Sequence, residues 1–196
     1  IDRYEDMLAF VDRVSEAGCD RFTVHARKAW LKGLSPKENR NIPPLRHDEV
    51  WRLKAERPAL EVEINGGITT LDEVENHLQH VDGVMIGRGA YDHPMRFARA
   101  DSRIFGAASD PLGHLPDPLE ARAEVVRQMA DYVRTLTGGR DRPKHVARHM
   151  LTLYAGLPGA RRWRRTLTEG LARNEAVDSL LMGALSIFQP SERAAG

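Results

Sequence analysis

The chain has 196 residues, of which 41% are hydrophobic and 29% charged, and its formal net charge of +1 does not by itself indicate a nucleic-acid partner. Its one cysteine, Cys19, excludes an intrachain disulfide and favours a reducing compartment, which we expect to be the cytoplasm. No apolar run reaches the roughly 18 residues of a membrane span, so we expect no membrane attachment.

The first half of the chain alternates between helical and strand patterns. A helix is expected where Met7, Leu8, Val11 and Val14 recur, ending at Gly18. The expected strands are residues 21–25, 60–65 and 83–86, and the further helices are residues 47–57, 70–80 and 91–100, with a long basic loop over residues 27–46. Helices that separate strands by short links predict a parallel sheet.

The pattern changes after about residue 101. Residues 106–117 are rich in Gly, Pro, Ser and Asp and are interpreted as a linker. No strand is expected after Pro118. Helices over residues 119–137, 143–154, 159–169 and 176–188 predict a small all-α bundle.

This order of elements is typical of an α/β fold, the C-terminal part of a (β/α)8 TIM barrel, followed by a helical bundle domain. The expected domains are a barrel part over residues 1–105, the linker, and a helical domain over residues 118–190. Three strands cannot close a barrel, which takes eight. Since the chain also begins with Ile1, we expect further barrel sequence upstream.

Two of the expected strands end in glycine-rich segments, Asn65-Gly66-Gly67 and Gly87-Arg88-Gly89. Glycines let a backbone approach a ligand and present N–H groups to an anion, and Arg88 could add a charge-assisted contact. Barrels commonly hold a phosphate on the loops after their last two strands. The alternative is a pair of tight strand-to-helix turns.

Basic side chains follow the first expected strand. His25 stands near its carboxyl end, and Arg27 and Lys28 come directly after it, which favours an anionic ligand over a structural histidine. The loop continues with Lys32, Lys37 and Arg40, and Trp30 offers a face for stacking. Long loops in compact domains are usually functional, although a solvated surface loop stays the alternative.

A second basic cluster covers residues 140–165. Eight Lys or Arg residues stand there against one acid, Asp141, for a local charge of +7. Arg161, Arg162 and Arg165 fall in the first turns of a helix, where the dipole disfavours cations unless an external anion meets them. Nucleic-acid phosphate is such an anion, and a solvated basic face is the alternative. Cys19 precedes a strand and is interpreted as a small core residue, not a nucleophile.

The phrases HARKAWLKGLSPKENRNIPPL, INGGI, HLQHVDGVMIGRGAY, RHML and GLPGARRWRR together resemble the A-type tRNA-dihydrouridine synthases over almost the whole chain. The resemblance implies an FMN-dependent oxidoreductase that reduces D-loop uridine in tRNA to 5,6-dihydrouridine, with NADPH as reductant. It also implies a monomer without a metal. The three expected strands would be strands 6, 7 and 8 of the barrel.

The resemblance also assigns residues. The positions that match FMN contacts of the family are His25, Asn65, Gly66, Gly67, Gly87 and Arg88. The positions that match tRNA contacts are Arg27, Lys37, Arg40, Arg161, Arg162 and Arg165. The family's proton donor is a cysteine in an Asn-x-x-Cys-Pro segment, which this chain lacks and which Cys19 does not match. The family's FMN-binding lysine would precede Ile1. We therefore expect no catalytic residue here and no activity of this chain alone.

Two other function classes stay open. The chain could be a non-catalytic RNA-binding module that uses the basic bundle. It could also come from another FMN- or phosphate-binding TIM-barrel oxidoreductase that shares only the glycine-rich strand ends. The arginines of residues 161–165 argue against the latter, and an Asn-x-x-Cys-Pro segment upstream would decide for the synthase.

Overall fold

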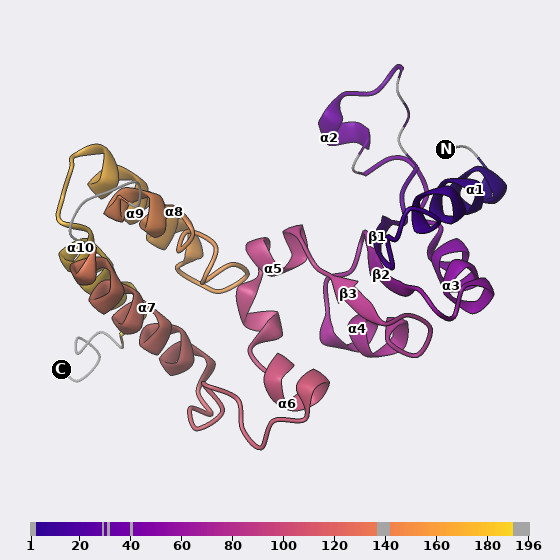
Figure 1. Ribbon diagram of the computed structural model, residues 1–196. Coiled ribbons are helices and arrows are strands. Elements are labelled where there is room, and N and C mark those ends of the chain that lie inside the picture. Colours follow the sequence, from indigo (N-terminus) through magenta and orange to yellow (C-terminus); the bar gives the residue numbers. More distant parts are fainter. Residues whose placement is uncertain (1–2, 29, 31, 40, 137–141, 190–196) are drawn as a thin grey trace, which may run out of the picture. The chain divides into compact units, whose positions relative to one another are not determined.

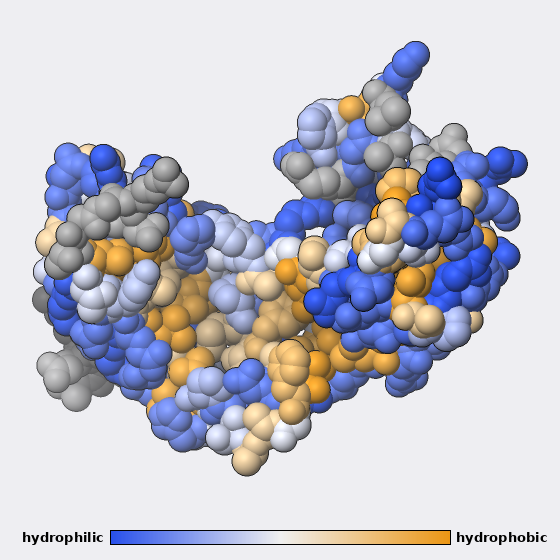
Figure 2. Space-filling model, in the orientation of Figure 1, coloured by the Kyte–Doolittle hydropathy of each residue, from blue (hydrophilic) through white to orange (hydrophobic). Residues whose placement is uncertain are grey.

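The computed structural model describes residues 3–28, 30, 32–39, 41–136 and 142–189 (Figure 1). The chain forms two compact units, Ile1–Ala90 and Tyr91–Gly196, each described here by itself. The first unit carries a small sheet with helices, and the described residues of the second contain helices and turns but no strand. Figure 2 shows hydrophilic side chains over much of the visible surface, with patches of apolar side chains among them.

The first unit contains a three-stranded parallel sheet in the order β1-β2-β3. The strands are β1 Arg21–His25, β2 Glu61–Asn65 and β3 Gly83–Met85. Its helices are α1 Tyr4–Ser15, α2 Pro36–Asn39, α3 His47–Glu56, α4 Leu71–His77 and α5 Arg88–Asp92, of which α5 runs on past the unit boundary. The predicted parallel α/β arrangement is confirmed, with strand bounds within a residue of those expected.

Alternation along the strands gives the sheet one apolar and one polar face. Val62 and Ile64 of β2 are fully buried, as is Leu53 of α3, and Val50 of α3 and Val74 of α4 are nearly so. These side chains form the core of the unit, with α3 packed on β2 and α4 on β3. The capping box at Thr70 is confirmed: Oγ1 accepts from the Glu73 amide at 3.2 Å, and Glu73 Oε2 accepts from the Thr70 amide at 3.0 Å.

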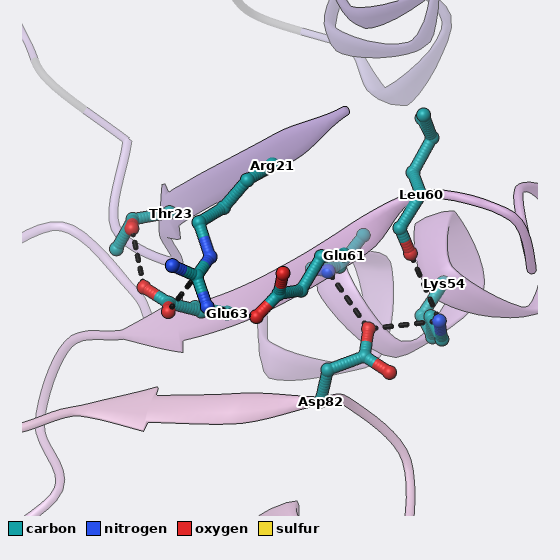
Figure 3. Close-up of polar contacts among 8 residues, drawn as sticks. Arg21, Thr23, Lys54, Leu60, Glu61, Glu63 and Asp82 are labelled. Atoms are coloured by element: carbon teal, nitrogen blue, oxygen red, sulfur yellow. Dashed lines mark hydrogen bonds and ion pairs between the residues drawn. The ribbon is translucent and has the colours of Figure 1, made fainter. Parts of the chain in front are cut away.

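The opposite face of the sheet is charged (Figure 3). Thr23 donates to Glu63 Oε2 at 2.6 Å, and Arg21 pairs with both Glu61 and Glu63. Gly83 of β3 leaves the room that Glu63 needs, because a Cβ there would lie 2.9 Å from Glu63 Cγ. These cross-strand pairs hold the register at the amino-terminal end of the sheet.

A lysine and an aspartate join the starts of two strands to α3 (Figure 3). Asp82 Oδ2 accepts from the Val62 amide at 2.8 Å and pairs with Lys54 Nζ at 2.8 Å. Lys54 also donates to the Leu60 carbonyl at 2.9 Å. These contacts hold the amino-terminal ends of β2 and β3 against α3. The loops that follow the carboxyl ends of the strands lie at the opposite edge of the sheet.

The second unit begins with short helical segments. The single helix predicted over residues 91–100 is wrong: α5 ends at Asp92, a 3-10 turn η1 covers Pro94–Phe97, and α6 covers Ala100–Phe105. Pro94 lacks an N–H and disfavours helical geometry in the preceding residue, and His93 lies at φ −141° and ψ 62°. Gly106 then ends α6 in the left-handed region at φ +66°.

The remainder of the second unit is a helical bundle (Figure 1). Its helices are α7 Pro118–Thr135, α8 Pro143–Arg148, α9 Ala160–Ala172 and α10 Val177–Ala184, with a 3-10 turn η2 over Leu185–Phe188. The core contains Trp163 and Leu167 of α9 with Val126 of α7 and Leu181 of α10, all fully buried. Tyr154 stacks on Phe188 with ring centroids 3.8 Å apart.

Two further expectations are corrected. The helix predicted over residues 143–154 ends at Arg148 and continues as turns, in which the amides of His149 and Met150 bond to the carbonyls three residues earlier. The Met150 carbonyl then accepts from Trp163 Nε1 at 2.8 Å. Cys19 is half-buried, not a core residue, and its Sγ lies 3.4 Å from the Arg21 carbonyl.

The domain bounds predicted at residues 105, 118 and 190 stay a prediction, and residue 190 lies outside the described residues. In the described part of the chain, none of the helices has the length and apolar character to cross a membrane. The described residues also contain no group of three or more His, Cys, Asp or Glu arranged to hold a metal ion.

Candidate functional site

The carboxyl ends of the three parallel strands lie at one edge of the sheet. In the register, His25 of β1 is beside Asn65 of β2, and Asn65 is beside Met85 of β3. Asn65 Nδ2 donates to the Met85 carbonyl at 2.7 Å. The two segments predicted to bind a ligand therefore lie at the carboxyl ends of neighbouring strands. They are residues 65–67 after β2 and residues 87–88 after β3.

The Gly66–Gly67 turn has a backbone that glycine adopts readily, with φ values of +119° and +78°. A Cβ on Gly66 would lie 3.2 Å from His25 Cε1, so the histidine ring lies directly against the turn. A Cβ on Gly67 would lie 2.4 Å from Leu45 Cδ1. The positive φ values favour glycine at both positions, and Leu45 packs closely over Gly67.

Two arginines, Arg27 and Arg88, lie close enough to His25 to affect its charge state. Its Nδ1 accepts a hydrogen bond from the Arg27 amide at 3.1 Å. Burial, then the charge of Arg27 and that of Arg88, lower the pKa of His25, and the backbone opposes this in part. At neutral pH the ring is uncharged, with its proton on Nε2. Two cations next to a neutral donor make a site that suits an anion.

Asn41 joins the two arginines and was not recognised in the sequence. Arg88 donates to Asn41 Oδ1 at 2.9 Å, and Arg27 donates to the Asn41 carbonyl at 3.0 Å and to the Pro43 carbonyl. Arg27 is thus used to close its own loop, although it was predicted to contact tRNA. The Asn41 side chain carries no recognisable sequence signal, because its partner stands 47 residues away.

The segment 87–89 combines an open and a crowded glycine. Nothing described lies within 4 Å of a Cβ on Gly87, so its backbone is accessible. A Cβ on Gly89 would lie 2.8 Å from the Ile68 carbonyl and 3.0 Å from Thr69 Cα. Gly89 therefore lets the start of α5 approach the loop that follows β2.

His47 is a second residue that the sequence did not reveal. It begins α3, and its Nε2 lies 2.8 Å from the Gly66 carbonyl oxygen. No motif marks it, because the contact spans 19 residues and depends on the path of the intervening loop.

The loop between β1 and α3 is folded locally. Asn39 pairs reciprocally with the Trp30 backbone, with both hydrogen bonds at 2.8 Å. Lys37 is exposed on α2, and Trp30 is 41% exposed. Arg40, also predicted to bind tRNA, lies outside the described residues.

An open groove of about 810 Å3 runs beside β1. Phe22 and Val24 contribute apolar wall, and His25, Arg27 and Lys28 line one part of it. The predicted site residues at the end of β1 thus border a concave surface within the first unit.

In the second unit, α9 separates its residues by face. Trp163, Leu167 and Gly170 are buried, while Arg161, Arg162, Arg164 and Arg165 are exposed. Arg165 pairs with Glu169 one turn later at 2.7 Å. Among the described residues, no carboxylate pairs with the other three arginines. The predicted cationic surface is therefore present, with Arg165 partly neutralised.

Comparisons with known proteins show the family of the chain. The dihydrouridine synthase (Dus) family model matches residues 1–188. The chain is 48% identical to a tRNA-dihydrouridine(20/20a) synthase of Synechocystis sp. over 184 residues, 94% of this chain and 53% of that protein. It is 46% identical to proteins of the same name from Shewanella oneidensis, over 89% of this chain and 50% of the relative, and from Escherichia coli K12, over 95% and 52%.

The chain spans about half the length of the curated relatives it matches. The matched range covers the first unit and the second unit as far as residue 188, including the glycine-rich strand ends and the α9 arginines. The chain therefore belongs to the dihydrouridine synthase family.

Proposed function

We propose that the protein carrying this chain is a tRNA-dihydrouridine(20/20a) synthase, which reduces uridine in tRNA with FMN as cofactor and NADPH as reductant. The observation that carries the proposal is the meeting of His25, the Gly66–Gly67 turn and Arg88 at one sheet edge, in a chain of this family. The three parallel strands would be the last three of a (β/α)8 barrel.

The residues at the sheet edge fit the phosphate of FMN. Backbone N–H groups at Gly66, Gly67 and Gly87 can donate to phosphate oxygens, and Arg88 can add a charge-assisted hydrogen bond. His25 keeps an Nε2 donor at neutral pH beside the same turn. The groove along β1 supplies apolar wall next to these groups, as small-molecule sites usually do.

Bound FMN would supply the hydride for uridine reduction. The residues of this chain would bind and orient the cofactor. Cys19 precedes β1, so it stands at the amino-terminal end of the sheet, opposite the edge that carries His25. We assign the proton donor to a residue outside this chain.

The exposed cations would hold the tRNA. Lys37 and the α9 arginines Arg161 and Arg162 are presented to solvent, as phosphate contacts require. Arg165 would contribute less, because Glu169 partly neutralises it. Arg40 belongs to the same proposal on its sequence position alone. The enzyme would work as a monomer in the cytoplasm.

Activity of the full-length protein tests the function directly. With FMN and NADPH, unmodified tRNA should gain dihydrouridine at positions 20 and 20a, read by mass spectrometry of nuclease fragments. A protein that binds tRNA but forms no dihydrouridine would be a non-catalytic RNA-binding module. A flavoprotein that oxidises NADPH without tRNA binding would be a different oxidoreductase.

We predict that Arg88→Ala in the full-length protein weakens FMN binding by roughly 10- to 100-fold, because a hydrogen bond to a charged group contributes about 1.5–3 kcal/mol. The affinity of the variant for riboflavin, which lacks the phosphate, should stay close to that of the parent protein. Flavin fluorescence titration measures both. Asn41→Ala is the matched control, since it removes one hydrogen-bond acceptor of Arg88 but keeps the charge. Equal FMN affinity in Arg88→Ala and parent would contradict the assignment.

A further inference from the structure

A cluster of aromatic rings lies behind the Gly66–Gly67 turn. His47 places Nε2 2.8 Å from the Gly66 carbonyl oxygen. Its ring meets the ring of His77 edge-on, with centroids 4.6 Å apart, and His77 is only 4% exposed. Trp51 donates from Nε1 to His77 Nδ1 at 3.1 Å. The turn is thus supported by side chains of both α3 and α4.

The partners decide where the protons lie. A carbonyl oxygen only accepts, so His47 Nε2 is the donor to Gly66. An indole N–H only donates, so His77 Nδ1 accepts from Trp51. His77 is therefore neutral, with its proton on Nε2, and a neutral ring can lie against His47 without charge repulsion.

The contact fixes the orientation of a whole peptide unit. The bond between Gly66 and Gly67 is planar and trans, so its C=O and N–H point in opposite directions. A donor held on the Gly66 oxygen sets the rotation of this plane and hence the direction of the Gly67 N–H. Two glycines have little intrinsic preference, so the plane needs such an external restraint.

We propose that His47 is a positioning residue for the ligand site: it holds the Gly66–Gly67 peptide plane so that the Gly67 N–H is presented to the ligand phosphate. The inference rests on the proposed FMN function. His47 does not contact the ligand and acts through the turn, while His77 and Trp51 hold its ring in place.

The test compares flavins with and without a phosphate. In the full-length protein, His47→Phe keeps a ring in the cluster but removes the donor, and should raise the Kd for FMN roughly 3- to 10-fold, the range of a neutral hydrogen bond. The Kd for riboflavin should change less than twofold. His47→Gln places an amide N–H near the position of Nε2 and should restore FMN affinity.

His80→Phe is the matched control. His80 stacks on Trp51 with centroids 4.2 Å apart but has no described contact with the turn, so FMN affinity should stay at the parent value. If His47→Phe proves unfolded by circular dichroism, His47→Asn replaces it, because its shorter side chain is polar but ends short of the Gly66 oxygen.

Unchanged FMN affinity in His47→Phe overturns the inference. So does an equal loss of FMN and riboflavin that His47→Gln does not restore, since that result indicates a merely structural role. A parent protein that binds neither flavin overturns the proposed function and this inference together, and it is recognised without any variant.

Discussion

At the scale of single residues, His77 is a histidine buried in the first unit, with only 4% of it exposed. Burial, then the charge of His47, lower the pKa of His77, with Glu73 opposing and His80 adding to the shift. Trp51 enforces the same state by donating to Nδ1. Protonation would put two donors face to face in a buried place, which is unfavourable.

We predict that acid destabilises the protein partly through His77. Because the folded pKa lies below the unfolded value of about 6.5, the unfolded chain takes up the proton first. The stabilisation is complete above pH 6.5 or so and is lost as the pH falls below it. His77→Asn keeps an acceptor for Trp51 but does not titrate, so its unfolding free energy should fall less than the parent's between about pH 7.5 and 5.5.

Urea denaturation at a series of pH values measures this difference. His114→Asn, which changes an exposed histidine of the second unit, should keep the pH dependence of the parent. If His77→Asn and parent lose the same stability over this range, the buried histidine is not the group responsible.

At the scale of elements, α5 can approach the loop after β2 only because residue 89 is a glycine and has no side chain. Gly89 faces backbone atoms, the Ile68 carbonyl and Thr69 Cα, which cannot move aside as a flexible side chain can. Gly87, two residues earlier, faces open space. The two glycines of one short motif therefore have different reasons to be glycine.

We predict that Gly89→Ala destabilises the protein by about 1–3 kcal/mol, the usual cost of overpacking, although alanine is the better helix former. Gly87→Ala is the matched control and should change the unfolding free energy by less than about 0.5 kcal/mol. Urea midpoints at one pH measure both. Equal effects of the two substitutions would show that α5 can shift to admit the methyl group.

At the scale of the whole molecule, the small net charge conceals a local concentration of positive charge on α9. The chain has a net charge of +1, yet α9 exposes four arginines, and only Arg165 has a described carboxylate partner. Burial of Trp163 and Leu167 fixes which side of the helix faces outward. An amphipathic helix thereby becomes a cationic surface without any cost to the core.

We predict that Arg161→Ala with Arg162→Ala weakens tRNA binding by the full-length protein and lowers the slope of log K against log salt by about 1.5 units, since each phosphate contact contributes roughly 0.7–0.9. Filter binding across a salt series measures the slope. Arg127→Ala is the control, because Arg127 of the same unit is paired with Glu120 and Glu124. A slope equal to the parent's would show that these arginines are only solvated and do not contact tRNA phosphates.

Local features could be predicted from the sequence because they depend on neighbours within a few residues. The alternation that makes β1 and β2, the capping box at Thr70 and the amphipathic α7 are all as expected. The break at Pro94 obeys an equally local rule, although the helical pattern after Tyr91 predicts one continuous helix there. The pairing of Arg165 with Glu169 could also be predicted from the sequence, because the two residues are one helical turn apart.

Only the tertiary structure decided how these pieces meet. His47 reaches Gly66, Asn41 joins Arg27 to Arg88, and Leu45 covers Gly67, across separations that no sequence period encodes. Such contacts depend on the path of the loop between β1 and α3, which brings its far end back to the sheet edge. The sequence by itself determined which residue types stand at the strand ends, and the folded loop determined which of them are held in place and by what.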